Sequence, residues 1–293
     1  MTDDRLDPRI NAFRDDLADI RLEGRVSAAR HVEGAPYRVT RPAAPLRRRP
    51  ADDAPLDTEL LFGETVRLFE TREDGWSWVQ ADLDTYVGYV PSAALQPVGE
   101  VPPTHRVPVP RTLVFPAPDI KRPPLFDLPM GALVTVTGSA EDHNARYSQI
   151  APAGYIVEQH LEPVTAKAED FVAVAERFLG VPYLWGGRTA NGIDCTGLTQ
   201  LALMMAGIAT PRDSDMQERA LGTRLAGIEA LRRGDLVFWK GHVGIMLDGR
   251  NLLHANAFHM MTAIEPLETA IARISAKGLD VTGVRRLGAG TAG

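Results

Sequence analysis

The sequence predicts two small β-barrels followed by an α+β domain. Residues 36–100 contain short stretches in which apolar and polar residues alternate, separated by Gly-Glu, Asp-Gly and Asp-rich turns. Residues 104–163 have the same texture, whereas residues 165–293 place helical periodicity first and short apolar strands after it. Helices followed by an antiparallel sheet are typical of an α+β domain. A polar leader, residues 1–35, is expected to wrap the surface of a larger body.

The two barrel segments look like one module used twice. The shared features are a Gly-led strand at 63–66 and 131–134, a Gly-aromatic-apolar step at 88–90 and 154–156, and a closing leucine at 95 and 161. About 60 residues of short strands with this ending are typical of a small barrel. The proline-rich segment 96–105 is predicted to link the copies.

The last domain is predicted to contain two helices and then at least three strands. In residues 168–180, one helical face collects Phe171, Val174, Ala175, Phe178 and Leu179. A second helix, 194–208, is apolar on most sides. Short apolar strands follow at 234–239, 242–247 and 252–256.

Composition and charge argue against several classes of protein. The formal net charge of −6 argues against a nucleic-acid binder, and the dense basic cluster at 47–49 is interpreted as a solvated loop. No stretch approaches the roughly 18 apolar residues of a membrane helix. The acidic start lacks an apolar run of signal-peptide length, so the protein is expected in the cytoplasm, without membrane partners. A single cysteine fits that reducing compartment.

That single cysteine, Cys195, is either a small buried hydrophobe or a nucleophile. It lies at the predicted start of the buried helix. There the helix dipole and unpaired backbone N–H groups favour a thiolate, and the N–H of Cys195 itself can hold an oxyanion. Asp194 opposes this, because a neighbouring carboxylate disfavours the thiolate. Asp194 is predicted to cap the helix, to hold a positive substrate group, or both.

His242 and His254 are the candidate base and its orienting partner. They lie on consecutive predicted strands, and Asp248-Gly249 signals a hairpin between them. A three-residue loop would place His254 opposite Gly244, on the same side of the sheet as His242. A one-residue shift would separate the rings. The alternative is a pair of core histidines, while a zinc site is disfavoured because no third ligand lies at a suitable spacing.

Several motifs then resemble one family. The string GVPYLWGGRTANGIDCTGL at 180–198, followed by GDLVFW, GHVGI and LLHAN, is similar to the catalytic domain of NlpC-type cell-wall peptidases over residues 168–286. The resemblance implies a papain-like fold, a Cys195–His242–His254 triad, and no cofactor or metal. Thr196 departs from the serine that is more frequent in the family after the cysteine, but it keeps the hydroxyl and is a candidate substrate contact.

The resemblance also implies roles for neighbouring residues. Tyr183 would help to stabilise the oxyanion, or alternatively pack against Trp185, which with Gly186-Gly187 is expected to shape the loop. Arg212, Asp213 and Ser214 lie where the family tends to contact substrate. The alternative is a capping or turn cluster.

The order of domains resembles a narrower group, the γ-D-glutamyl-diamino-acid endopeptidases with bacterial SH3-like domains. In that group the Asp before the cysteine pairs with the free amine of an N-terminal L-Ala, which would explain Asp194. By analogy Glu64, Tyr86 and Tyr89 of the first barrel are candidate substrate contacts. Otherwise Glu64 is a turn residue and the tyrosines are half-buried strand residues.

The expected function is hydrolysis of the γ-D-Glu–diamino acid bond in murein peptides that begin with L-Ala, in cell-wall peptide recycling. The diamino acid would be meso-diaminopimelate or lysine. One alternative is a less specific amidase or acyltransferase on the same scaffold. Another is a non-catalytic protein that binds wall peptides.

Overall fold

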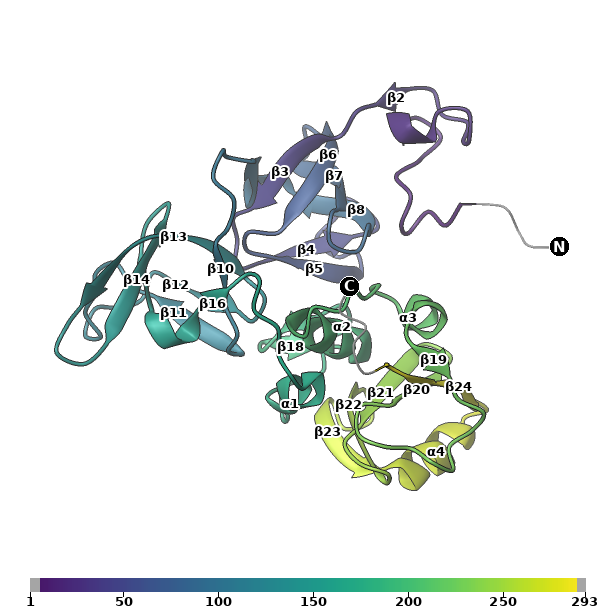
Figure 1. Cartoon of the computed structure of the whole chain (residues 1–293). Helices are drawn as coiled ribbons and strands as arrows, with labels where there is room; N and C mark the ends of the chain where they lie inside the picture. The colour runs from purple at the N-terminus through teal and green to yellow at the C-terminus, as the bar shows by residue number, and fades with distance from the viewer. Residues whose placement is uncertain (1–5, 289–293) are drawn as a thin grey trace. The chain divides into compact units, whose positions relative to one another are not determined.

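The computed structural model describes residues 6–288, which form two compact units divided between Val164 and Thr165 (Figure 1). The first unit is built almost entirely of strands, and the second combines helices with strands, which fits the predicted α+β class. Within residues 6–288, no helix is long and apolar enough to cross a membrane.

The first half of the first unit is a seven-stranded sheet of order β5-β4-β8-β7-β6-β3-β9. Its strands are β3 (Ala35–Val39), β4 (Ala43–Arg47), β5 (Leu56–Leu61), β6 (Thr65–Thr71), β7 (Trp76–Ala81), β8 (Val87–Pro91) and β9 (Leu95–Pro97). The apolar residues of the alternating pattern face inward, and Leu46, Leu60 and Val79 are fully buried in the core. The sequence therefore alternates, as expected, because each strand has one face toward the core.

Most of this pairing order recurs after the proline-rich linker, where the strands are divided between a five-stranded and a two-stranded sheet. The strands are β10 (His105–Arg106), β11 (Arg111–Val114), β12 (Phe126–Pro129), β13 (Leu133–Glu141), β14 (Arg146–Ala151), β15 (Tyr155–Val157) and β16 (Glu162–Pro163). β13 pairs with β10 and β14 as β6 pairs with β3 and β7, and β11 pairs with β12 as β4 pairs with β5. A second SH3-like barrel stays a prediction, which this recurrence supports.

The leader, from residue 6 onward, lies along the first sheet. It contains β1 (Ala18–Asp19), the 3₁₀ turn η1 (Ile20–Leu22) and β2 (His31–Val32). Leu17 is buried with Phe69 and Trp78, and the Arg14 guanidinium lies 4.3 Å from the Trp78 ring centroid. The leader thus adds a small second core to the barrel; residues 1–5 lie outside the described residues.

The second unit has a six-stranded antiparallel sheet of order β19-β24-β20-β21-β22-β23. Its strands are β19 (Thr223–Arg224), β20 (Leu236–Trp239), β21 (His242–Met246), β22 (Asn251–Asn256), β23 (Met261–Pro266) and β24 (Val281–Arg286). The helices are α1 (Phe171–Glu176), α2 (Cys195–Met205), α3 (Ser214–Ala220) and α4 (Leu267–Ser275), and a short hairpin joins β17 (Arg188–Thr189) to β18 (Gly192–Ile193). α2 packs against β21 and β22.

The first helix is shorter than the apolar pattern over 168–180 predicts. Asp170 caps it by accepting a 2.9 Å hydrogen bond from the Val172 N–H, and the helix ends at Glu176. The chain then turns away, because the Gly180 N–H donates to the Thr262 carbonyl at 2.9 Å. The hydrogen bond to Thr262 on β23 thus ends the helix although the apolar pattern continues beyond Glu176.

The hairpin between β21 and β22 has the predicted register. Ile245 pairs with Leu253, and the Leu247 N–H donates to the Asn251 carbonyl across a three-residue loop. Asp248 stabilises that loop by accepting from the Arg250 N–H at 2.7 Å. His254 is therefore opposite Gly244, as expected.

Gly63 provides a stability test of the first unit. It has φ +84°, and a Cβ there would lie 2.2 Å from the Leu133 carbonyl oxygen. Gly75 has φ +86° with open space around it, so it is the matched control. Gly75→Ala should lower the free energy of unfolding by about 1–2 kcal/mol, from backbone strain alone. Gly63→Ala should cost about 1–3 kcal/mol more, because of the overlap. Urea unfolding of the full chain checks this, and equal losses would contradict it.

Candidate active site

Cys195 is the first residue of α2, and its side chain is 6% exposed. The residue before it, Asp194, has extended backbone angles and caps the helix, since its Oδ1 accepts from the Gly197 N–H at 2.6 Å. The predicted helix start and cap are confirmed. The sole thiol of the chain thus lies at the N-terminal end of a buried helix.

Burial raises the pKa of the Cys195 thiol to about 12, and the neighbouring Asp194 charge adds to the rise. A hydrogen bond from the Val243 backbone, the Arg212 charge and the Thr196 backbone act in the opposite direction. The expectation that the helix N-terminus favours a resting thiolate is therefore wrong. The reason is desolvation, which outweighs the favourable backbone groups.

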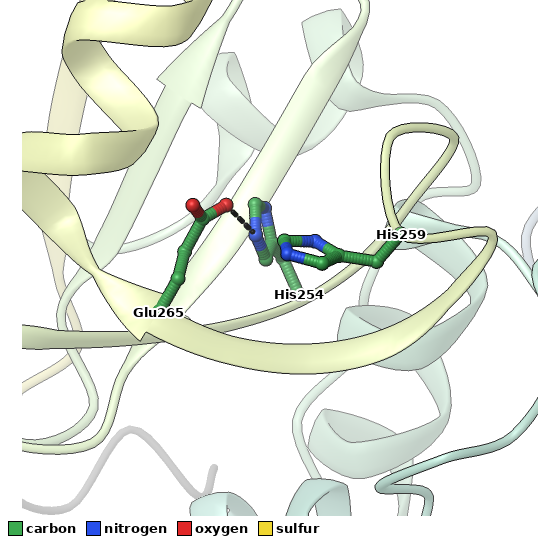
Figure 2. Close-up of side chains that lie close together, drawn as sticks. All are labelled: His254, His259 and Glu265. Carbon is green, nitrogen blue, oxygen red and sulfur yellow. Dashed lines mark hydrogen bonds and ion pairs between the residues drawn. The ribbon is translucent and has the colours of Figure 1, made fainter.

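A chain of hydrogen bonds runs through three neighbouring strands. His242 Nε2 on β21 lies 2.8 Å from His254 Nδ1 on β22, and His254 Nε2 lies 2.8 Å from Glu265 Oε1 on β23. Figure 2 shows the Glu265 carboxylate directed at the His254 ring. His254 is 1% and Glu265 is 7% exposed. Since Nε2 of His242 faces His254, Nδ1 is the nitrogen left for another partner.

Burial also lowers the pKa of His242 to about 3, with smaller contributions from the His254 and Arg273 charges. The pKa of His254 falls to about 3 for the same first cause. Both rings are thus neutral near pH 7. The indole of Trp239 packs beside His242, with ring centroids 5.6 Å apart, and restricts the rotation of the imidazole.

Two observations place the end of β21 at the thiol. α2 packs against β21, and the Val243 backbone hydrogen bonds to the thiol. Val243 directly follows His242, so the strand end that carries the imidazole lies beside Cys195. A neutral imidazole next to a neutral thiol can accept its proton as the sulfur attacks a carbonyl carbon.

The carboxylate of Asp194 has many partners inside the unit. It accepts from the Gly186 N–H at 2.9 Å and the Thr196 hydroxyl at 3.0 Å, besides the Gly197 N–H. The guanidinium of Arg212, which is 1% exposed, donates to both carboxylate oxygens at 3.1 and 2.8 Å. A carboxylate has about four lone-pair sites. The group that the sequence offers for a substrate amine is thus already occupied by donors of the chain.

The loop before the helix brings Tyr183 to the thiol. Burial raises the pKa of Tyr183, and the neighbouring Cys195 and Asp194 add to the rise, so its phenol stays protonated and able to donate. The Tyr183 N–H donates to the Met260 carbonyl at 2.9 Å. Trp185 is 63% exposed, and its expected role in shaping this loop with Gly186-Gly187 stays a prediction. The backbone turns the Trp185 side chain outward, next to Gly186 at φ +77°.

The Arg212–Ser214 segment borders the same site. Arg212 also donates to the Thr196 hydroxyl, and Ser214 begins α3 with 8% exposure. Gln217 on α3 donates to the Thr196 carbonyl at 3.1 Å. Asp213 occupies the N-cap position but makes no side-chain cap bond. The segment therefore holds the start of α2 in place, and Ser214 stays a candidate substrate contact.

The three candidates in the first unit have internal roles. Glu64 Oε2 accepts from the Leu61 N–H at 2.9 Å, in a turn. Tyr86 is part of the barrel core, and the Tyr89 hydroxyl accepts from Arg14 Nη1 at 2.9 Å. Glu64 and Tyr89 match the alternative roles that the sequence suggested, whereas Tyr86 is buried and precedes β8 rather than being a half-buried strand residue. A substrate role for the three residues stays a prediction.

One group of side chains could hold a metal ion. Ligand atoms of His254, His259 and Glu265 all lie within 4.8 Å of one another (Figure 2). Sequence spacing missed this third ligand. However, Arg273 forms an ion pair with Glu265, and His254 already hydrogen bonds to it. A cation would have to displace both interactions, so the structure favours a role in the hydrogen-bond chain over metal binding for these residues.

Comparisons with known proteins agree with this site. Residues 180–274 match the NlpC/P60 family, and residues 46–95 match the bacterial dipeptidyl-peptidase Sh3 domain. This chain carries an NlpC/P60 domain. Its second unit carries the family's domain, and the domain match includes the helix start and both histidine strands.

Sequence similarity to known relatives extends over both units. The chain is 27% identical over 231 residues to dipeptidyl-peptidase 6 of Lysinibacillus sphaericus, covering 73% of this chain and 84% of the relative. It is 27% identical to the γ-D-glutamyl-L-lysine dipeptidyl-peptidase of Bacillus subtilis, covering 69% and 73%. An NlpC/P60 crystal structure from Bacillus cereus has the same fold, with TM-score 0.72, 21% identity, and 86% and 99% coverage. The chain is thus a cysteine peptidase.

Thiol chemistry tests the buried, neutral cysteine. Below its pKa, the thiolate fraction of Cys195 grows about tenfold per pH unit. Because that pKa is about 12, iodoacetamide labelling should accelerate by about tenfold per unit from about pH 6 to 9, without a plateau. Intact mass spectrometry measures the rate, with Cys195→Ser as the unlabelled control. A plateau near neutral pH would mean a preformed thiolate.

Proposed function

We propose that this NlpC/P60 peptidase hydrolyses the γ-D-Glu–diamino acid bond of short murein peptides with a free N-terminal L-Ala. The observation that carries the proposal is the thiol at a helix start beside a histidine chain in a domain of this family. Relatives named dipeptidyl-peptidase, two of them γ-D-glutamyl-L-lysine dipeptidyl-peptidases, support the bond and its position.

In the proposed reaction, the Cys195 sulfur attacks the γ-carbonyl carbon while its proton passes to His242 Nδ1. The resulting oxyanion accepts hydrogen bonds from the Cys195 N–H and the Tyr183 hydroxyl. His242 then gives its proton to the leaving amine of the diamino acid, and a thioester remains. Water attacks the thioester, His242 takes the proton of that water and returns it to the thiolate, and L-Ala-D-Glu leaves.

The neutral resting groups determine the order of the first step. With a thiol pKa of about 12 and an imidazole pKa of about 3, a separated thiolate–imidazolium pair is unfavourable before substrate binds. Proton transfer therefore accompanies the attack on carbon, as with a serine nucleophile. Electrostatic interactions with the bound substrate then have to stabilise the charges that develop as the sulfur attacks.

The requirement for a free amine rests mainly on the relatives. A dipeptidyl-peptidase releases two residues from the N-terminal end of a peptide, and dipeptidyl-peptidase 6 carries that name. Asp194 and Arg212 together have no net charge, and donors of the chain already occupy the carboxylate, so an amine would have to displace one of those donors. We propose that Asp194 orients the amine end by exchanging one of these hydrogen bonds for one from the amine.

A short substrate with a free N-terminal amine supports a role after the wall has been cut. A peptide that begins with L-Ala has already lost its sugar attachment, and recycling of such peptides in the cytoplasm is the setting that we propose. The diamino acid is meso-diaminopimelate or lysine, and the relative from Bacillus subtilis is named for lysine.

A digest of paired peptides tests this function. L-Ala-γ-D-Glu-meso-diaminopimelate, its lysine counterpart and the N-acetylated form of each are incubated with the full chain. We expect release of L-Ala-D-Glu from the free-amine peptides only, because the proposed site binds the free N-terminal amine, which acetylation removes. Mass spectrometry measures the products, and Cys195→Ala should release none.

Other outcomes of the digest select the alternatives. Equal cleavage of free and acetylated peptides would favour a less specific amidase or acyltransferase on the same scaffold and would overturn the amine requirement. Binding without cleavage by the wild type, measured by calorimetry with the same peptides, would favour a non-catalytic wall-peptide binding protein.

A further inference from the structure

We propose that Glu265 is a positioning residue that sets the tautomers of His254 and His242, so that His242 Nδ1 is the proton acceptor. This inference rests on the proposed function, in which His242 takes the thiol proton. Neither the sequence motifs nor the comparisons assign a role to Glu265.

The sheet register places Glu265 behind His254. His254 pairs directly with Ala263 on β23, and Glu265 is two residues further along the same strand. Residues two apart on a strand share a face, and diagonal neighbours are within reach of long side chains. The small side chain of Ala263 leaves room for Glu265 to reach the ring, and the 2.8 Å contact results.

The chemistry of the acceptor then fixes each proton in turn. An ionised carboxylate only accepts, so His254 carries its proton on Nε2 and presents a lone pair at Nδ1. His242 must donate from Nε2 to that lone pair, at 2.8 Å. A neutral imidazole has one N–H, so Nδ1 of His242 is left with the lone pair. With the opposite tautomers, the thiol would face an N–H that cannot accept its proton.

Arg273 on α4 holds the carboxylate for this purpose. It forms an ion pair with the same Glu265 oxygen that faces His254, and its guanidinium lies 4.2 Å from the Phe258 ring centroid. His254 and Arg273 thus contact the same oxygen of Glu265, and an oxygen that accepts from the guanidinium serves as the acceptor for His254 as well. His259 does not compete, since its Nδ1 is 3.1 Å from Asn256 Oδ1.

The test combines spectroscopy of the resting enzyme with kinetics. Histidine-selective ¹⁵N NMR of the full chain should show His254 and His242 both protonated at Nε2. Glu265→Leu removes the acceptor at similar volume, so both tautomers should become mixed and kcat should fall about tenfold to hundredfold, with KM nearly unchanged. Glu265→Gln keeps an oxygen for both donors and should restore most of kcat. Glu268→Leu, exposed on α4, is the matched control and should change neither readout.

Each result decides the proposal. Wild-type spectra with the Nδ1–H tautomer at His254, or Glu265→Leu with unchanged tautomers and kcat, would overturn it. If Glu265→Leu does not fold, the wild-type tautomers and the Glu265→Gln kinetics decide. If the wild type cleaves none of the murein peptides, the tautomers still report on Glu265, so failure of the proposed function remains distinguishable from failure of this role.

Discussion

Antiparallel pairing of β21, β22 and β23 in one register is the constraint on which the site depends. Side chains alternate between the two faces of a strand, so a slip of one residue would move a histidine to the opposite face. In the observed register, His242, His254 and Glu265 make two successive 2.8 Å contacts. The three-residue loop stabilised by Asp248 fixes the first pairing, and the small Ala263 accommodates the second.

Burial determines how these groups can react. The thiol and both imidazoles are removed from water, which disfavours their charged forms and leaves all three neutral. Two charged pairs lie in this buried region, Asp194 with Arg212 and Glu265 with Arg273. One pair holds the start of the nucleophile helix and the other holds the end of the histidine chain, so each supports one side of the proposed reaction.

Local patterns in the sequence predicted a large part of this arrangement. The Asp-Gly hairpin signal and twelve-residue spacing placed the two histidines together, and Asp194 before an apolar run predicted the helix cap. What the sequence could not predict depends on contacts between distant segments. Arg212 reaches Asp194 only after the chain between α2 and α3 folds back, and Glu265 reaches His254 only through a further strand. The raised thiol pKa and the exposed Trp185 likewise follow from three-dimensional packing.

The most direct test of the central claim is capture of the acyl-enzyme. L-Ala-γ-D-Glu-diamino acid peptide is mixed with the full chain, quenched in acid within one turnover, and digested for peptide mapping by mass spectrometry. The account predicts an L-Ala-D-Glu thioester on Cys195 that decays in wild type and is absent from Cys195→Ala. Product release without any adduct at Cys195, or with activity kept in Cys195→Ala, would contradict it.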